Sequence, residues 1–87
     1  PEEARKEGIA AIVSLPIVHL GEVVGVLRLY HYEPWKVSEQ DLESLQILAG
    51  IIGLAMTYAR FHNTVHAIAE VLGHTFQVEL TPKLGRR

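Results

Sequence analysis

Three side chains of metal-binding type recur at every fourth position in the second half of the chain: His62, His66 and Glu70. Residues four apart share one face of a helix, and this is the spacing by which two imidazoles hold one metal ion. The zinc-protease motif also requires a glutamate directly after its first histidine, and residue 63 is an asparagine. We therefore expect a solvated helix face here and no metal site.

A second group of candidate residues lies on a predicted strand. The candidates are Val24, Val26, Arg28 and Tyr30. They occupy every second position, so all four share one side of that strand. A guanidinium and a phenol among apolar neighbours suit an anionic or planar ligand. The competing interpretation places both polar tips in water near the strand end. His31 is of a type that binds haem iron, but nothing else in the sequence supports a haem, so the cofactor stays unknown.

The sequence has few features that indicate an enzyme. The 87 residues include no cysteine, which excludes disulfides, thiolate metal sites and cysteine nucleophiles. No serine lies in a G-x-S-x-G context, and no glycine-rich loop leads from a strand into a helix to hold phosphate. We expect that the protein is not an enzyme.

Charge and hydropathy argue against two classes of partner, nucleic acids and membranes. The net charge is −2, and the only basic cluster is Lys83, Arg86 and Arg87, so we expect no nucleic-acid partner. The charged N-terminal residues do not resemble a signal peptide. The longest apolar stretch, residues 45–59, is shorter than the roughly 20 residues that span a bilayer. These features predict a cytoplasmic protein with no membrane partner.

Two apolar runs at the start of the chain predict a β-hairpin. They cover about residues 9–20 and 22–32, are rich in β-branched side chains, and are separated at Gly21. Pro16 has no N–H for a strand ladder, so we expect it at a sheet edge or a bulge.

A long helix is predicted to follow, over about residues 39–72. Ser38 is a suitable N-cap with Asp41 three residues later, no proline interrupts the segment, and Gly73 is suited to the C-cap position. Residues 73–87 form a tail, either a short strand or disordered, with alternating apolar residues at Phe76, Val78 and Leu80.

The apolar residues of this predicted helix form two series on nearly opposite faces. The first stops at Ala59 and is expected to pack on the sheet: Leu42, Leu45, Ala49, Ile52, Met56 and Ala59. The second continues with heptad spacing and predicts a homodimer through a coiled coil: Ile47, Ile51, Leu54, Tyr58, Phe61, Val65, Ile68 and Leu72. The alternative is that both series belong to the core of a larger domain.

The order of several short motifs resembles the C-terminal half of a GAF domain over about residues 7–72. Ser14-Leu15-Pro16-Ile17 matches the family's "PL" strand, and Gly21-Glu22-Val23-Val24-Gly25-Val26-Leu27 matches its "GE-x-I-G-V-L" strand. Val37-Ser38-Glu39-Gln40-Asp41-Leu42 corresponds to the "F-s-x-x-D" start of the last helix. The family's first helix and early strands have no counterpart, so the chain is either a fragment or a form without the usual pocket.

The resemblance implies an α+β fold in which an antiparallel sheet packs against one long C-terminal helix, with the N-terminal part of the domain missing. It also implies a sensory or regulatory domain of signal transduction that dimerises through its last helix and takes a small-molecule ligand on the sheet. We expect a regulatory module that dimerises through the helix; the alternative is a purely structural dimerisation domain with no ligand.

Overall fold

The computed structural model describes residues 8–83 and contains four strands and one helix in this part of the chain. In chain order these are β1 (Ala11–His19), β2 (Glu22–His31), α2 (Glu39–Ala59), β3 (Val65–Val71) and β4 (His74–Pro82). The fold is therefore α+β, as expected, but the helix lies in the middle of the chain and not at its C-terminal end.

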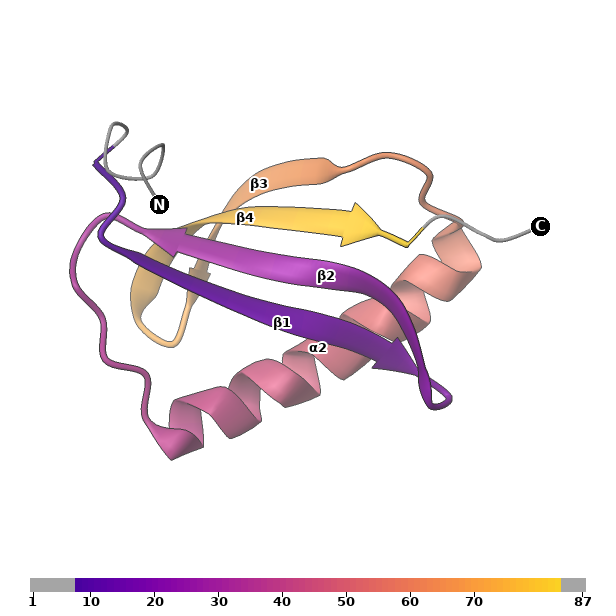
Figure 1. The fold of residues 1–87 in the computed structure, drawn as a ribbon, viewed down its shortest axis with the longest axis horizontal. Coiled ribbons are helices and arrows are strands. Elements are labelled where there is room, and N and C mark those ends of the chain that lie inside the picture. Colours follow the sequence, from indigo (N-terminus) through magenta and orange to yellow (C-terminus); the bar gives the residue numbers. More distant parts are fainter. Residues whose placement is uncertain (1–7, 84–87) are drawn as a thin grey trace.

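All four strands belong to one antiparallel sheet with the order β1-β2-β4-β3. Helix α2 crosses one face of this sheet, packed mainly on β1 and β2 (Figure 1). The result is a two-layer arrangement with one covered face and one open face. Strands β1 and β3 form the two edges of the sheet.

The β1–β2 hairpin forms where the sequence predicts it. Leu20 and Gly21 form its two-residue turn, both with positive φ (52° and 79°), as turns that match the strand twist require. Pro16 lies on edge strand β1, close to a bulge in β2 where Val24 is the extra residue opposite Ile17 and Val18. This placement confirms the expectation from its missing N–H.

Helix α2 begins as predicted but ends much earlier. The Asp41 N–H donates to Ser38 Oγ at 3.0 Å, which caps the first turn. At the other end Arg60 adopts a left-handed conformation (φ 57°), and its N–H donates to the Met56 carbonyl at 2.9 Å. The predicted helix to Leu72 is therefore wrong, since it stops at Ala59.

Residues 65–82 form a second hairpin instead. Leu72 and Gly73 turn the chain with positive φ (55° and 79°), just as Leu20 and Gly21 do. A glycine with positive φ suits a helix C-cap and a hairpin turn equally well, so Gly73 did not distinguish the two. The tail is a strand as far as Pro82, and residues 84–87 lie outside the described part.

The core lies between α2 and the covered face of the sheet. The helix contributes Leu45, Ala49 and Met56, which are members of the first predicted series. They meet five buried residues of the sheet: Leu15, Ile17, Leu27, Leu29 and Phe76. At Gly53 the helix approaches β1 closely, because a Cβ there would lie 3.0 Å from Ile17 Cγ2.

Gly50 lies on the exposed side of the same helix, and a Cβ there would meet no atom within 4 Å. Gly50→Ala is therefore expected to raise the free energy of unfolding by roughly 0.5–1 kcal/mol, because alanine loses less backbone entropy in a helix. Urea unfolding followed by far-UV circular dichroism measures this change. An unchanged or lower midpoint would contradict the placement of Gly50 within a regular, exposed turn of α2.

Candidate functional site

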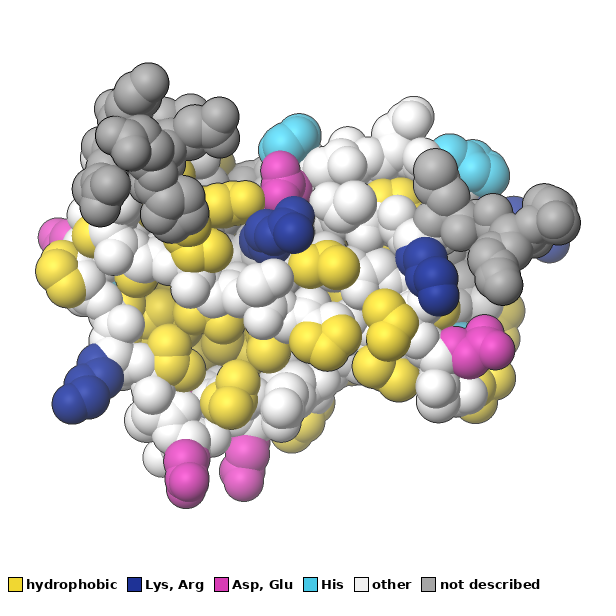
Figure 2. All heavy atoms as spheres, in the orientation of Figure 1, with side chains coloured by type: hydrophobic (Ala, Val, Ile, Leu, Met, Phe, Trp, Pro, Cys, Tyr) yellow, Lys and Arg dark blue, Asp and Glu magenta, His cyan; other side chains and the backbone are white. Residues whose placement is uncertain are grey.

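The open face of the sheet carries a small polar network at its centre. Glu79 Oε1 accepts a hydrogen bond from Arg28 Nη1 at 3.2 Å and another from the Tyr30 hydroxyl at 3.0 Å. Arg28 lies directly opposite Glu79 in the β2–β4 register. The face around them mixes apolar and charged side chains (Figure 2). Arg28 and Tyr30 thus lie on the same face of β2 and share one carboxylate as their acceptor.

The two valines predicted for the same site have different surroundings. Val26 lies on β2 between Pro16 and Thr81. Val24 lies at the bulged end of the hairpin, where it packs against the hydrophobic core. The structure therefore brings Arg28, Tyr30 and Val26 onto one face, while Val24 contributes to packing.

Glu79 is the site residue that the sequence analysis missed. It is 51 positions from Arg28 in the chain and becomes its neighbour only because β4 pairs with β2. Its one sequence signal is the polar series Thr75, Gln77, Glu79 and Thr81, which alternates with apolar residues as a strand with one exposed face does.

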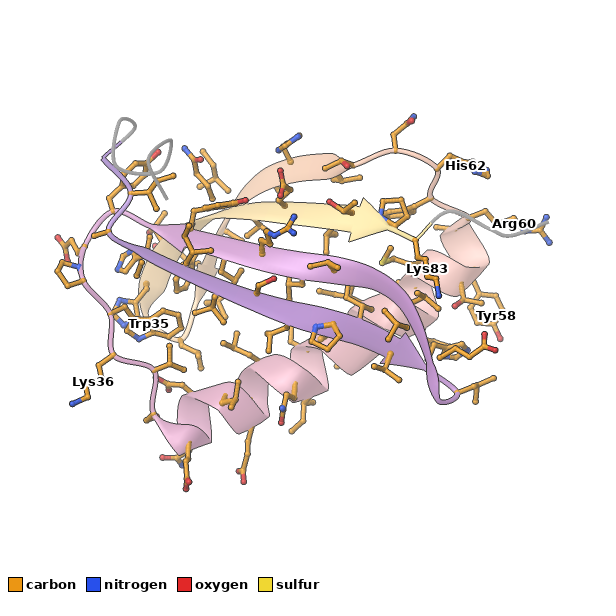
Figure 3. All side chains as sticks on the ribbon, viewed as in Figure 1. Trp35, Lys36, Tyr58, Arg60, His62 and Lys83 are labelled. Atoms are coloured by element: carbon orange, nitrogen blue, oxygen red, sulfur yellow. The ribbon has the colours of Figure 1, made fainter. Side chains whose placement is uncertain are left out.

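A second candidate surface is the outer side of α2, which we call the outer stripe: Ile47, Ile51, Leu54 and Tyr58. These side chains are between 46% and 79% exposed and point away from the sheet; Figure 3 labels Tyr58 near the C-terminal end of the helix. The stripe fits the predicted second series as far as residue 58.

The other half of that predicted dimer interface is not helical. Phe61 follows the helix and packs against the core, Val65 and Ile68 lie on β3, and Leu72 is in the hairpin turn. The continuous heptad series is therefore wrong beyond Ala59. Apolar residues on both faces of β3 mimic the heptad spacing, because Val65 faces the covered side of the sheet and Ile68, three residues later, faces the open side.

Among the described residues, α2 is long and apolar enough to cross a membrane by length and composition. The apolar stretch at residues 45–59 is shorter than the helix that contains it, which has 21 residues and a length of about 30 Å. The length argument against a membrane span is therefore wrong. The core helix of a soluble domain passes the same test, and the inner side of α2 packs on the sheet.

One end of the core consists of four rings: His31, Trp35, His74 and Phe76. The His31 ring lies 5.0 Å from both the His74 and Phe76 rings, and Trp35 lies 4.9 Å from Phe76. His31 is buried, and its Nδ1 lies 3.1 Å from the Thr75 carbonyl, an acceptor, so Nδ1 carries the proton. This packing gives His31 a structural role.

The solvated helix face expected for His62, His66 and Glu70 is wrong, because none of the three residues lies on a helix. Residues 60–64 lie outside the helix and His66 and Glu70 lie on β3, so the fourfold spacing no longer places the side chains on one helix face. Within residues 8–83 no cluster of three or more His, Cys, Asp or Glu residues has metal-binding geometry.

Comparison with known protein families identifies the N-terminal two thirds of the chain. A family model described as GAF domain matches residues 1–57. The chain belongs to the GAF domain family. Neither the curated proteins nor the solved structures gave a match.

The GAF match covers the β1–β2 hairpin and nearly all of α2. It therefore includes Arg28, Tyr30 and the first three residues of the outer stripe, and it ends one residue before Tyr58. Strands β3 and β4 lie beyond the match, and so does Glu79. Membership of the GAF family indicates a regulatory or sensory module in general terms.

Proposed function

We propose that this GAF domain is a cytoplasmic, non-catalytic regulatory module of a signal-transduction protein, and that two copies pair through the outer stripe of α2. The observation that carries the proposal is the continuous row of exposed apolar side chains at Ile47, Ile51, Leu54 and Tyr58. Such a row on one helix is costly in water and is typical of an interaction surface.

The position of the stripe also supports pairing. The inner side of α2 already fills the core, so the outer stripe faces solvent in the single domain. The charged residues Glu39, Asp41 and Glu43 are confined to the first turns, and the helix from Ser44 to Ala59 has no charged side chain. Two such helices can therefore approach one another without burying a charge.

Ligand sensing is the less supported part of the GAF expectation. Arg28 and Tyr30 both donate to Glu79, so this carboxylate competes with an anionic ligand for the same two donors. The hydrogen bonds of Arg28 and Tyr30 to Glu79 favour the alternative in which the domain is a structural dimerisation unit without a ligand. Thermal stability measured with anionic and planar compounds separates these two versions of the function, because a ligand raises it and an inert surface does not.

A charge in the middle of the stripe tests the pairing. Ile51→Asp is expected to raise the dimer dissociation constant at least about 100-fold, because a carboxylate from each copy would be buried without a partner. Sedimentation velocity at low micromolar concentration measures the change: the original chain sediments as a dimer and the variant as a monomer.

Gln46→Asp is the matched control, because it adds the same charge to the same helix on a flank outside the stripe. It is expected to leave the dimer intact. A monomeric original chain, or equal dimerisation of both variants, would rule out the outer stripe as the interface.

A further inference from the structure

The two edges of the sheet are protected to very different degrees. Edge strand β1 carries Pro16, which has no N–H for a further strand, and its pairing with β2 shifts register at Ile17 and Val18, where Val24 of β2 is the extra residue. Edge strand β3 has the sequence Val-His-Ala-Ile-Ala-Glu-Val, with no proline, no lysine and no bulge. Helix α2 packs mainly on β1 and β2, at the far side of the sheet from β3 (Figure 1). β3 is therefore a regular and uncovered edge within the described residues.

The direction of the β3 backbone groups follows from the hydrogen bonds of the neighbouring strands. The Lys83 N–H donates to the Val24 carbonyl, and the Ala10 N–H donates to the His31 carbonyl. Even-numbered residues of β2 therefore bond towards β4, and odd-numbered ones bond towards β1. By the same alternation, the odd-numbered residues of β4 bond towards β2 and its even-numbered ones bond towards β3.

The even-numbered residues of β4 lie opposite Val65, Ala67, Ala69 and Val71. These four residues of β3 thus use their N–H and C=O groups within the sheet. His66, Ile68 and Glu70 direct theirs to the outer edge. Their side chains all lie on the open face, in the same row positions as Glu79, Gln77 and Thr75 respectively.

The sequence of β3 is complementary to itself when read in the opposite direction. In an antiparallel pair of two copies centred on Ile68, Val65 meets Val71 of the other copy and Ala67 meets Ala69. His66 meets Glu70, so that an imidazole N–H can donate to the carboxylate, and Ile68 meets its own counterpart. The three residues with outward backbone groups then form the hydrogen-bonded pairs of this register.

Ile68 supplies a second indication. Its side chain is 74% exposed at the centre of the strand, and on the open face it lies between those of His66 and Glu70. A polar residue would suit a solvated edge at this position. In the self-paired arrangement two Ile68 side chains would pack against each other and lose much of this exposure. We infer that the β3 edge pairs with the β3 edge of a second copy, in antiparallel register about a two-fold axis at Ile68.

This interface is separate from the outer stripe of α2, and it lies in the part of the chain beyond the GAF match. One seven-residue strand on each side buries less surface than the roughly 1,000 Å² that a stable interface needs. Without the helix interface, the β3–β3 dimer is therefore weak, and its population depends on the protein concentration. In a chain that also pairs through the helix, the two interfaces together build assemblies larger than a dimer.

Engineered cysteines test the pairing and its register, because the chain has no cysteine of its own. The variants are made in the Ile51→Asp chain at high concentration, so that helix pairing does not contribute. Ile68→Cys is expected to form a disulfide-linked dimer under mild oxidation, since paired Cα atoms would lie about 5.5 Å apart. Gln77→Cys is the control in the same row on β4; its counterparts would lie about 14 Å apart across three strand spacings.

Cross-linking between two different cysteine variants tests the register of the two β3 strands. His66→Cys alone and Glu70→Cys alone should not cross-link, because each position lies about 14 Å from its own counterpart along the strands. A mixture of the two variants should cross-link, since residue 66 of one copy faces residue 70 of the other. Equal cross-linking in all samples, or none with Ile68→Cys beyond the Gln77→Cys level, overturns the inference.

A charge exchange tests the same interface without cysteines. In the Ile51→Asp chain, His66→Glu is expected to raise the dissociation constant about tenfold, because it places two glutamates opposite each other. Adding Glu70→His should restore association, since the pair is re-formed in reverse. Failure of the double variant to recover overturns the pairing. So does slow amide exchange at Ile68 that is independent of concentration, because another segment of the same chain would then cover the edge.

Discussion

Phe76→Ala is expected to lower the free energy of unfolding by about 3–5 kcal/mol. Phe76 is fully buried near the start of β4 and fills one end of the core between α2 and the sheet. Its ring also contacts the rings of Trp35 and His31, with centroids 4.9 Å and 5.0 Å away. Alanine leaves a cavity that this small core cannot close. A chain of this length has a total stability of roughly 4–13 kcal/mol, so the loss is a large fraction.

Trp35 is the only tryptophan and lies in the same cluster, so its fluorescence reports the change directly. We expect a lower urea midpoint and red-shifted emission of the variant before unfolding, as Trp35 loses its packing partner. Thr75→Ala is the control, because Thr75 precedes Phe76 on β4 and points to the open face; it should change stability by less than about 0.5 kcal/mol. Similar midpoints for the two variants would contradict a core built around β4.

Gly25→Ala is expected to destabilise the domain by about 1–3 kcal/mol or more, although it adds a single methyl group. A Cβ at Gly25 would lie 2.6 Å from the Thr81 carbonyl oxygen and 3.0 Å from Met56 Cε. The methionine side chain can move aside. The carbonyl belongs to the backbone of β4, so strands β2 and β4 would have to separate locally.

The effect should be visible in hydrogen exchange as faster exchange of the β2–β4 amides, together with a lower urea midpoint. Gly50→Ala is the matched substitution at a site with open space, and its expected effect has the opposite sign. Equal stability of Gly25→Ala and the original chain would mean that β4 does not pair with β2 in this register. The comparison therefore tests the second hairpin, which the sequence analysis did not predict.

Local signals predicted the first half of the fold well. The hairpin turn at Leu20 and Gly21, the edge position of Pro16 and the Ser38 cap each depend on residues within a few positions of one another. Such features are set by backbone sterics and by short-range hydrogen bonds, so the sequence is sufficient to locate them.

The second half shows where local signals fail. Residues 60–72 include no proline and have apolar residues at helical spacing, yet they form a loop and β3. The His62-Asn63-Thr64 loop and the β-branched residues that follow favour a strand only slightly. The decisive contribution is the pairing of β4 with β2, a long-range contact that leaves little trace in the local sequence.

The candidate sites divide in the same way. The outer stripe was predicted as far as Tyr58, because a helix places residues three and four apart on one side regardless of its neighbours. The partner of Arg28 and Tyr30 was not predicted, because Glu79 is brought to them only by the sheet order β1-β2-β4-β3. The unprotected β3 edge was not predicted either, because residues 65–71 were assigned to a helix.

The sequence by itself determined the GAF-type hairpin, the start of α2 and the two apolar faces of that helix, since each depends on contacts between residues near one another in the chain. The tertiary structure alone decided that the helix ends at Ala59, that Glu79 joins Arg28 and Tyr30, and that β3 forms an edge of the sheet. These features depend on which strands pair across long separations, and the free energy of that pairing comes from the whole core.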